Sequence, residues 1–394
     1  MKIAAIRATP VNIPLEAPYV WAFGELPGFT RTIVEVETVD GVIGIGDCNG
    51  ADAVRIITEL FAPMLIGRNI VDINGAEEVC VPWWRGVQSI NDPGIIAAFG
   101  AVETAMWDIK GKVWSQPIHA LLGGAIRTEI PFTDYFSFRG DGPTVVGEKT
   151  AEEVADYCVR MHEEHGTTFF EGKLSTHDYR VGMKSVRLIR ERLGDDVLIR
   201  VDSNAAYSLT TALRMAPELE ELGVRGWEDP VATFEEMVRL RQHCSIPIST
   251  HNIDLVRAVN VGAPDALVTS PSIVGGIGRF ARLAAACEEM GIDLWCYSGD
   301  SGVGTASYLQ VCAAIGWIRE PNQSLLQMQP FDVIAEGPFR PRNNTVPVPT
   351  GPGLGVTLDP AKLAHAHALF IDNGPMDKYH QPERPSAYRR LPLS

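Results

Sequence analysis

The spacing of hydrophobic positions divides the chain into a shorter N-terminal part and a longer second part. Apolar and polar residues alternate on both sides of the turn signal Asp40-Gly41, which predicts a β-hairpin. The apolar positions then follow helical spacing over residues 52–67 and 95–124, the second stretch ending in a Gly-Gly pair. A hairpin followed by helices does not suit a parallel sheet. We therefore predict a separate α+β unit over residues 1–125.

From about residue 129, short apolar runs alternate with helical patterns. Eight runs are strand candidates: residues 128–137, 167–175, 197–204, 224–230, 246–250, 265–272, 292–299 and 325–329. This alternation is typical of the α/β class and predicts a (β/α)8 TIM-type barrel over residues 126–335. No Gly-x-Gly-x-x-Gly follows an early strand, so a dinucleotide-binding sheet has no support. Residues 336–394 leave the barrel pattern, and we expect them to return to the N-terminal unit.

Polar side chains stand at the ends of three successive predicted strands. The first of these strands ends in Asp202 and Asn204, the next in Glu228, and the third in His251 and Asn252. Barrels hold metals and substrates at the C-terminal ends of their strands, so these groups can converge on one ion. Oxygen ligands favour Mg²⁺, whereas a histidine widens the choice toward Mn²⁺, Fe²⁺ or Zn²⁺. The alternative is that Asp202 and Asn204 only cap the following helix.

Composition narrows the class of protein. A chain of 394 residues with 45% hydrophobic content can bury a large core. The formal charge of −15, without a basic tract, argues against a nucleic-acid partner, and an acidic substrate would need a locally positive site such as a metal. Seven cysteines without CxxC spacing suit a reducing cytoplasm. The chain has no signal-like N-terminus and no apolar run of membrane length, so we expect a cytoplasmic protein without a membrane partner.

Residues 19–30, which precede the hairpin turn, are aromatic and glycine-rich. Such a composition suits a mobile lid over a ligand. An ordinary surface Ω-loop is the alternative interpretation.

Several motifs in a fixed order resemble one known family. They are TRTIVEVE at 30–37, TDYFSFRG at 133–140, DSN at 202–204, WEDP at 227–230 and PGLGVTLDPAKLAHAHALF at 352–370. Together they are similar to the enolase superfamily, in its mandelate racemase and muconate lactonizing branch, and in detail to the glucarate dehydratase subgroup. The resemblance implies a modified barrel with an α+β capping domain. It also implies a Mg²⁺ enzyme, with Mn²⁺ as the other candidate, that removes the proton α to a carboxylate and expels a β-hydroxyl.

The resemblance also implies roles for individual residues. Asp202 and Glu228 match two metal ligands, and the third ligand position falls on His251. Lys173 matches the family's base, while Glu171 replaces the lysine that usually stands two residues before it. A neighbouring carboxylate raises a lysine's pKa, so Glu171 would make Lys173 a poorer base at rest. A plain ion pair between Glu171 and Lys173 is the alternative interpretation.

On the opposite face, the subgroup's histidine–aspartate dyad is missing. Tyr297 and Ser270 stand in those places. A tyrosine can donate a proton to a leaving hydroxyl, but it is a weak base at neutral pH, so two-base racemisation or epimerisation is disfavoured. We assign Tyr297 as the acid or as a substrate contact, and we expect Tyr135, Glu171, Asn204 and Ser270 to contact substrate.

The sequence thus predicts a metal-dependent lyase that dehydrates an acid sugar or related hydroxycarboxylate. A cycloisomerase or epimerase of the same superfamily is the first alternative. The second is a metal-binding barrel that has lost catalysis and binds a ligand. We further expect a small-molecule carboxylate substrate and a homo-oligomer.

Overall fold

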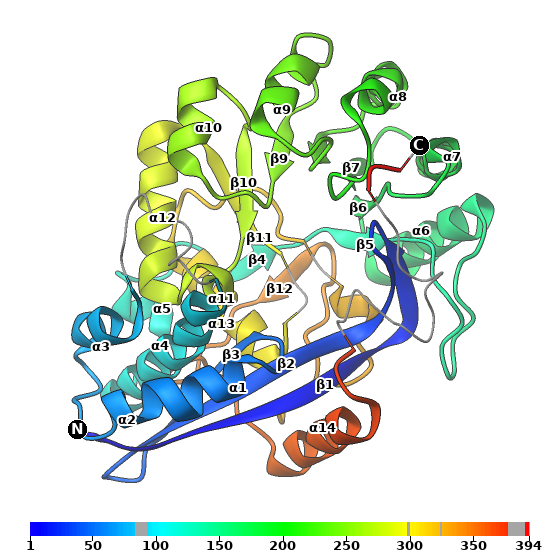
Figure 1. The fold of residues 1–394 in the computed structure, drawn as a ribbon. Helices are drawn as coiled ribbons and strands as arrows, with labels where there is room; N and C mark the ends of the chain where they lie inside the picture. The colour runs from blue at the N-terminus through cyan, green and yellow to red at the C-terminus, as the bar shows by residue number, and fades with distance from the viewer. Residues whose placement is uncertain (83–92, 298–299, 324, 377–390, 394) are drawn as a thin grey trace.

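The N-terminal part of the chain forms an antiparallel sheet backed by helices. The computed structural model describes residues 1–82, 93–297, 300–323, 325–376 and 391–393. The sheet has the order β1 (Ile3–Trp21), β2 (Gly24–Thr38) and β3 (Ile43–Asn49) (Figure 1). The helices are α1 (Ala53–Arg55), η1 (Ile56–Phe61), α2 (Ala62–Leu65), α3 (Ile73–Cys80), α4 (Pro93–Trp114) and α5 (Ile118–Leu121). The predicted α+β composition of this part is confirmed.

Two glycines of β3 bring this sheet against α4. A Cβ atom on Gly44 would lie 2.1 Å from the Ala105 carbonyl oxygen, and one on Gly46 would lie 1.9 Å from that of Ala101. These positions therefore exclude any side chain. The predicted turn at Asp40-Gly41 joins β2 to β3, with Gly41 in the left-handed region at φ +79°.

The second part forms a curled, parallel, seven-stranded sheet with helices outside it, so the predicted modified TIM-type barrel with a capping domain is confirmed. The strands run in the order β11-β10-β9-β8-β7-β6-β5. They are β5 (Asp134–Phe136), β6 (Phe169–Lys173), β7 (Leu198–Asp202), β8 (Gly226–Glu228), β9 (Ile248–Thr250), β10 (Ala266–Thr269) and β11 (Asp293–Cys296). The helices are α6 (Ala151–His165), α7 (Tyr179–Leu193), α8 (Leu209–Glu221), α9 (Phe234–Arg241), α10 (Leu255–Val261), α11 (Pro271–Val274), α12 (Ile277–Met290) and α13 (Gly302–Ala314).

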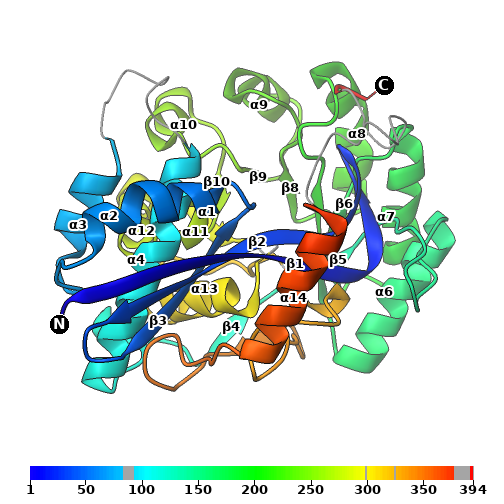
Figure 2. The ribbon, with the colours of Figure 1, turned by 60° about the horizontal axis from the view of Figure 1, so that its bottom comes forward.

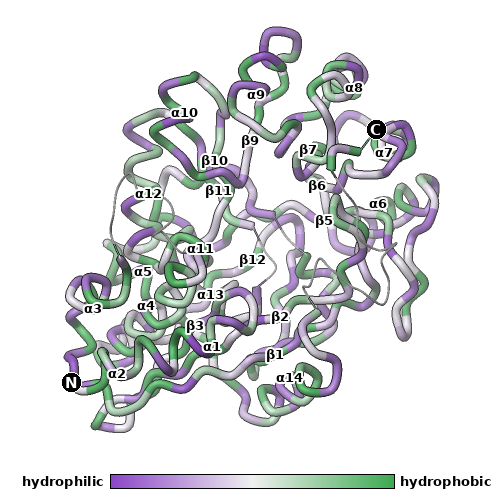
Figure 3. Tube along the Cα trace, in the orientation of Figure 1, coloured by the Kyte–Doolittle hydropathy of each residue, from purple (hydrophilic) through white to green (hydrophobic). Residues whose placement is uncertain are grey.

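The outer helices carry one buried face each, which anchors them to the barrel. Hydrophobic and hydrophilic residues alternate along α7 and α8 (Figure 3). α13 differs, because every residue from Gly302 to Ala313 is buried. Among the described residues, no helix is both long and apolar enough to cross a membrane.

The prediction of an eighth strand at residues 325–329 is wrong. Leu326–Met328 form the short 3-10 helix η2. The Arg340 side chain, instead of a neighbouring strand, donates to the carbonyls of Leu326 and of Gln329, the residue after this helix. The gap between β11 and β5 is bridged slightly earlier in the chain. The Asn322 carbonyl accepts from Thr133 N at 2.8 Å, and its side-chain oxygen accepts from Cys296 N at 2.7 Å.

The first predicted barrel strand, residues 128–137, is in fact two strands. β4 (Glu129–Pro131) pairs antiparallel with β12 (Thr345–Pro347), and only β5 joins the barrel. The break has a clear cause, because Pro131 O and Thr133 N both bond to the Asn322 backbone instead of continuing one ladder.

The C-terminal segment lies against the capping sheet. α14 (Pro360–Asn373) runs across β1 (Figure 2), where the Asn12 amide donates to the carbonyls of Leu369 at 3.2 Å and Gly374 at 2.9 Å. Leu354, which comes earlier in this segment, donates its backbone N–H to the buried Asp108 carboxylate of α4. The same carboxylate also accepts from Ile45 N of β3. The C-terminal segment therefore returns to the N-terminal domain. The exact domain boundaries at 125 and 335 stay predictions.

Candidate active site at the barrel mouth

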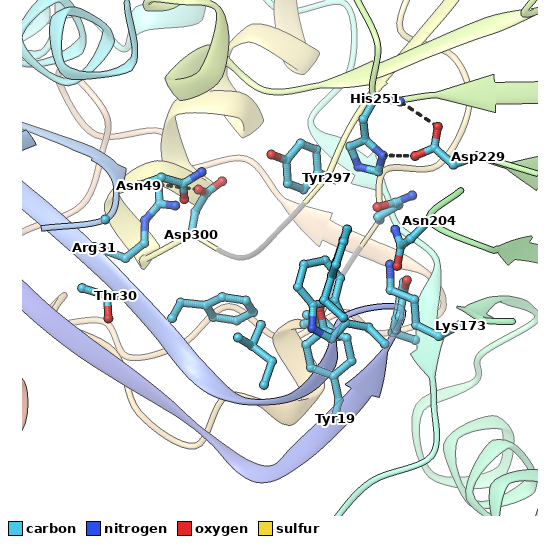
Figure 4. Close-up of a pocket in the computed structure, with 18 residues that line it drawn as sticks. Tyr19, Thr30, Arg31, Asn49, Lys173, Asn204, Asp229, His251, Tyr297 and Asp300 are labelled. Carbon is cyan, nitrogen blue, oxygen red and sulfur yellow. Dashed lines mark hydrogen bonds and ion pairs between the residues drawn. The ribbon is translucent and has the colours of Figure 1, made fainter. Parts of the chain in front are cut away.

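A cavity of about 550 Å³ lies between the capping sheet and the carboxyl ends of the barrel strands (Figure 4). This volume is in the usual range for a small-molecule site. Five residues expected at the site line it: Tyr135, Lys173, Asn204, His251 and Tyr297. Asp202 and Glu228 are fully buried at neighbouring strand ends. Glu171 and Ser270 are not among the lining residues.

Strand register brings the predicted base and metal ligands side by side. Lys173 pairs with Asp202 across β6 and β7, and Asp202 pairs with Glu228 across β7 and β8. Because these strands are parallel, their last side chains meet at one edge. The Lys173 ammonium donates to Asp202 Oδ2, and the Tyr135 hydroxyl lies 3.5 Å from the same oxygen. Burial opposes the charge of Lys173, but Asp202 outweighs it and raises the lysine's pKa.

The structure does not pair Glu171 with Lys173, so the alternative interpretation, a plain ion pair between them, is wrong. Glu171 Oε2 accepts from Arg200 Nη2 at 2.6 Å, and its Oε1 accepts from Gln323 Nε2 at 2.7 Å. Arg200 is the cross-strand partner of Glu171, and both side chains are buried below the cavity floor. The pKa of Lys173 rises as expected, but the leading carboxylate is Asp202 rather than Glu171.

The helix-cap interpretation of Asp202 and Asn204 is also wrong. Ser208 caps α8 and accepts from Thr211 N. Asn204 instead holds the carboxylate, since its backbone N donates to Asp202 Oδ1 at 2.7 Å and its side chain donates to Oδ2 at 3.0 Å. Asn204 adopts a left-handed φ of +45°, a strained conformation that often marks a functional site.

The environment of Glu228 fits a divalent cation. Its carboxylate is fully buried, with Oε2 accepting from Gln323 while Oε1 has no hydrogen-bond partner among the described residues. Burial first, and then the charge of Asp202, raise the pKa of Glu228 well above its usual range. This buried oxygen lies beside a second carboxylate and lacks a hydrogen-bonded positive partner in the described part of the chain, because His251 Nδ1 approaches it only as an ion pair at 3.5 Å. A hard cation bound to Asp202 and Glu228 would supply it.

Asp229 is a site residue that the sequence reasoning missed. His251 Nδ1 lies 2.8 Å from Asp229 Oδ2, and Thr250 donates to Asp229 Oδ1 at 2.5 Å. Residues adjacent on a strand normally point to opposite sides, but Asp229 has φ +42° and so turns toward the cavity. The WEDP motif, with its second acid directly after Glu228, was the available signal.

Ligand atoms of Glu228, Asp229 and His251 lie within 4.8 Å of one another and could hold a metal. This set differs from the predicted one, which had Asp202 in place of Asp229. Asp202 is instead paired with the Lys173 ammonium. Of the two candidates for the third ligand, His251 faces the cavity, while Asn252 Oδ1 accepts from Asp254 N. Burial lowers the pKa of His251, but Glu228 and Asp229 outweigh it and raise that pKa to about 9.

The residues that stand in place of the missing dyad make different contacts. The Tyr297 ring packs edge-on against His251, with centroids 4.9 Å apart, and lines the cavity. The Ser270 hydroxyl is buried and lies 3.0 Å from that of Ser272. The predicted substrate contact of Ser270 therefore has no support from its position.

Residues 19–30 form the tip of the β1–β2 hairpin, and not an Ω-loop. Tyr19 pairs with Leu26, and Trp21 pairs with Gly24. Trp21 and Phe23 pack edge to face at 4.8 Å and line the cavity, where the Trp21 ring centroid lies 5.9 Å from Lys173 Nζ. The hairpin tip thus forms an aromatic wall of the site.

The fold and site together define a barrel enzyme architecture whose mouth is covered by a capping sheet. The family model "Mandelate racemase / muconate lactonizing enzyme, N-terminal domain" matches residues 3–123, and "Enolase C-terminal domain-like" matches residues 153–362. The chain belongs to the mandelate racemase/muconate lactonizing enzyme family of the enolase superfamily, as its motifs indicated.

Curated relatives of the chain carry different activities. A probable glucarate dehydratase of Streptomyces coelicolor is 28% identical over 95% of this chain and 93% of its own length. A chloromuconate cycloisomerase of Pseudomonas putida is 28% identical over 93% and 99%. An arabinonate dehydratase of Saccharolobus solfataricus is 29% identical over 82% and 87%. These names do not agree on one reaction.

Solved structures agree with the fold. An enolase from Streptomyces coelicolor is 32% identical, with a TM-score of 0.85 over 96% of this chain and 100% of that one. An enolase from Thermobispora bispora, complexed with magnesium and formate, is 25% identical, with a TM-score of 0.85 over 95% and 94%. Solved members of the fold therefore include one that holds Mg²⁺ and a small carboxylate.

Proposed function

We propose that this protein is a Mg²⁺-dependent lyase that removes the proton α to the carboxylate of a hydroxylated acid and eliminates the β-hydroxyl as water. The observation that carries the proposal is the row Lys173, Asp202 and Glu228 on three neighbouring strand ends, under a cavity of small-molecule size. It places one amine beside a pair of buried carboxylates. Mn²⁺ is the other candidate ion.

The chain's own residues divide the work of such a reaction. Asp202 and Glu228, with His251 or Asp229, would hold the ion, which when bound neutralises the substrate carboxylate and makes the α-proton more acidic. Lys173 Nζ, once it has lost its own proton, would take the α-proton from the side of β6. Its ion pair with Asp202 favours the ammonium form, so Lys173 could act as a base only after Asp202 binds the ion instead of the ammonium. Tyr297, or His251 beside it, donates a proton to the leaving hydroxyl. The Trp21 wall excludes water from the reacting carbon.

A second function, epimerisation or cycloisomerisation, is favoured by the contact between His251 and Asp229. An imidazole oriented by a carboxylate is a competent acid or base, and this dyad replaces the one missing from β10 and β11. With Lys173 on β6 and His251 after β9, the cavity offers two groups that could exchange protons with substrate. The chloromuconate cycloisomerase among the relatives adds to this candidate.

The experiment is turnover of a panel of acid sugars with Mg²⁺ and after chelation, with formation of the 2-keto product as the readout. The lyase proposal expects keto acid to form only with the metal. In deuterated water, the same assay separates the two functions, because epimerisation puts deuterium on both faces of the α-carbon without loss of water. Binding of an acid sugar without any turnover or exchange would contradict both and leave a ligand-binding protein.

A further inference from the structure

A polar cluster closes the end of the cavity opposite the proposed reaction centre. Arg31 on β2 and Asn49 on β3 are direct cross-strand partners, and Asp47 stands two residues before Asn49, so the three share one face of the capping sheet. Asp300 approaches them from the barrel. Figure 4 shows Arg31, Asn49 and Asp300 together, across the cavity from Lys173.

Two carboxylates share the single cation of this cluster. Arg31 Nε donates to Asp47 Oδ1 at 2.8 Å, and Nη2 lies 2.6 Å from Asp300 Oδ1. The Arg31 side chain is only 1% exposed, so this pairing is poorly screened by solvent. Asp47 is fixed in turn by Ser301, whose N and Oγ donate to its Oδ2. The cluster therefore carries more negative than positive charge before any ligand arrives.

Polar atoms of the cluster are nevertheless left for a ligand. Arg31 Nη2 contacts Asp300 as an ion pair but has no hydrogen-bond partner among the described residues, so it retains an N–H to donate. Asn49 is exposed to the cavity and offers both a donor and an acceptor. Asp300 offers a carboxylate oxygen. Hydroxyl groups, which donate and accept, satisfy all three.

A second carboxylate on the substrate would fit this end poorly. It would be the third carboxylate on one buried guanidinium, and it would face the Asp300 carboxylate at this end of the cavity. We propose that the Arg31–Asn49–Asp300 end makes the enzyme select acid sugars with one carboxylate and a hydroxylated tail, and reject sugar acids with a carboxylate at both ends. This inference rests on the proposed function, in which the first carboxylate of the substrate would bind to the ion held by Asp202 and Glu228.

The test uses matched pairs of aldonates and aldarates, each pair sharing chain length and stereochemistry, with Mg²⁺ present. We expect the better aldonate to exceed its paired aldarate in kcat/KM by at least about tenfold, the factor that a modest electrostatic penalty of 1.4 kcal/mol produces. Equal or better turnover of the aldarates would overturn the inference while leaving the lyase proposal intact.

Variants of the exposed Asn49 test the charge argument without disturbing the buried pair. Asn49→Lys adds a cation and is expected to raise aldarate turnover relative to aldonate, whereas Asn49→Asp should lower it further. Asp300→Asn should act in the same direction as Asn49→Lys. Asp40→Asn, in the turn that joins β2 to β3 and so at the other end of β3 from Asn49, is the control and should leave the ratio unchanged. An aldonate-to-aldarate ratio that does not respond to the sign of the charge at 49 would refute the assignment.

Calorimetry of each acid with the Mg²⁺-loaded protein separates the two ways of failing. If neither series binds or turns over, the proposed function fails and the inference fails with it. If aldarates bind more tightly than aldonates, only the assignment of the distal end is wrong.

Discussion

At the scale of single residues, Lys173 is the group most directly tied to the chemistry. If Lys173 is the base, Lys173→Ala should lower kcat by the ~10²–10⁴ that general base catalysis supplies. Lys173→Arg is the matched control, because it keeps the charge beside Asp202 but cannot act as a base near neutral pH. Both variants should be inactive, and the arginine variant should still bind Mg²⁺. Tyr297→Phe should cost less activity, since it removes a donor only.

Wild-type turnover in Lys173→Ala would mean that another group carries the proton, and His251 is the first suspect. The sequence alone favoured deuterium incorporation with one stereochemical sense, because no base was expected opposite Lys173. The contact of His251 with Asp229 provides a candidate second base. Incorporation of deuterium on both faces of the α-carbon would therefore indicate epimerisation instead of water elimination.

The metal site gives the second prediction at this scale. Asp202→Asn should abolish Mg²⁺ binding, because the amide supplies neither the charge nor the second anionic oxygen that a hard cation needs. The apolar body of β7, with Ile199 and Val201 fully buried, should keep the barrel folded. Calorimetry measures the binding, and circular dichroism checks the fold. Asp178→Asn, an exposed helix cap outside the cavity, is the control. Unchanged Mg²⁺ affinity in Asp202→Asn would remove the central hypothesis.

Site residues are predictable from the sequence where regular strands alone determine their positions. Strand ends in parallel register meet, so Asp202, Glu228 and Lys173 could be placed together from the sequence. Asp229 was harder to place, because WEDP shows a second acid after Glu228 but does not show the left-handed φ that turns its side chain toward the cavity. The partner of Glu171 is equally hard to predict, since Arg200 is a single charged residue within the apolar run 197–201, and only the strand register places it opposite Glu171.

At the scale of elements, the β1–β2 hairpin tip is the piece most suited to move. It combines the aromatic wall of Trp21 and Phe23 with glycines at 24 and 28. An acid ligand with Mg²⁺ should therefore order residues 19–30 and protect their amides from hydrogen exchange. The turn at 39–42, at the other end of β2, should exchange at the same rate in both states. Equal order of residues 19–30 with and without ligand would show that the tip is a fixed wall.

The sequence predicted the helices and strands correctly where they are regular. It failed where tertiary hydrogen bonds replace the pairing of neighbouring strands. The β2–β3 hairpin and the strands β6 to β11 follow their hydrophobic runs. Residues 325–329 also have the pattern of a strand. However, the Arg340 guanidinium donates to the carbonyls of Leu326 and Gln329, and Asn322 bridges β11 to β5 instead. A side chain far along the sequence thus overrode a local pattern.

At the scale of the whole molecule, the capping domain and the barrel are joined through buried polar groups. Arg31 and Asp47 of the capping sheet contact Asp300 and Ser301 at the start of α13, and Glu103 of α4 reaches α12. The site is built across this junction, so no single domain contains it. All seven cysteines are free and buried, as their spacing indicated. The cytoplasmic location and the homo-oligomer expected from the sequence stay predictions.

Glu103 offers a test of this junction that depends on pH. Its carboxylate accepts from Ile277 N at 2.8 Å, Gly278 N at 2.9 Å and Trp107 Nε1 at 2.8 Å. Burial is the largest influence on it and raises its pKa from 4.5 to about 7, against the opposing effect of these hydrogen bonds. The folded protein therefore binds this proton more tightly than the unfolded chain does. The stabilisation is fully present below the unfolded pKa and is lost as pH rises through the folded pKa.

Glu103→Gln removes this titration. As the pH rises from about 4 to about 8, the free energy of unfolding of the variant should therefore increase relative to that of the wild type by roughly 3 kcal/mol. Other buried acids with raised pKa values, such as Asp134 and Asp332, titrate in both proteins and cancel in the difference. Any constant cost of the amide at the α12 terminus shifts the difference equally at every pH. Urea unfolding at several pH values measures it, with the exposed Glu37→Gln as control. Parallel pH profiles for Glu103→Gln and the wild type would show that Glu103 is already ionised in the fold and that its three donors outweigh its burial.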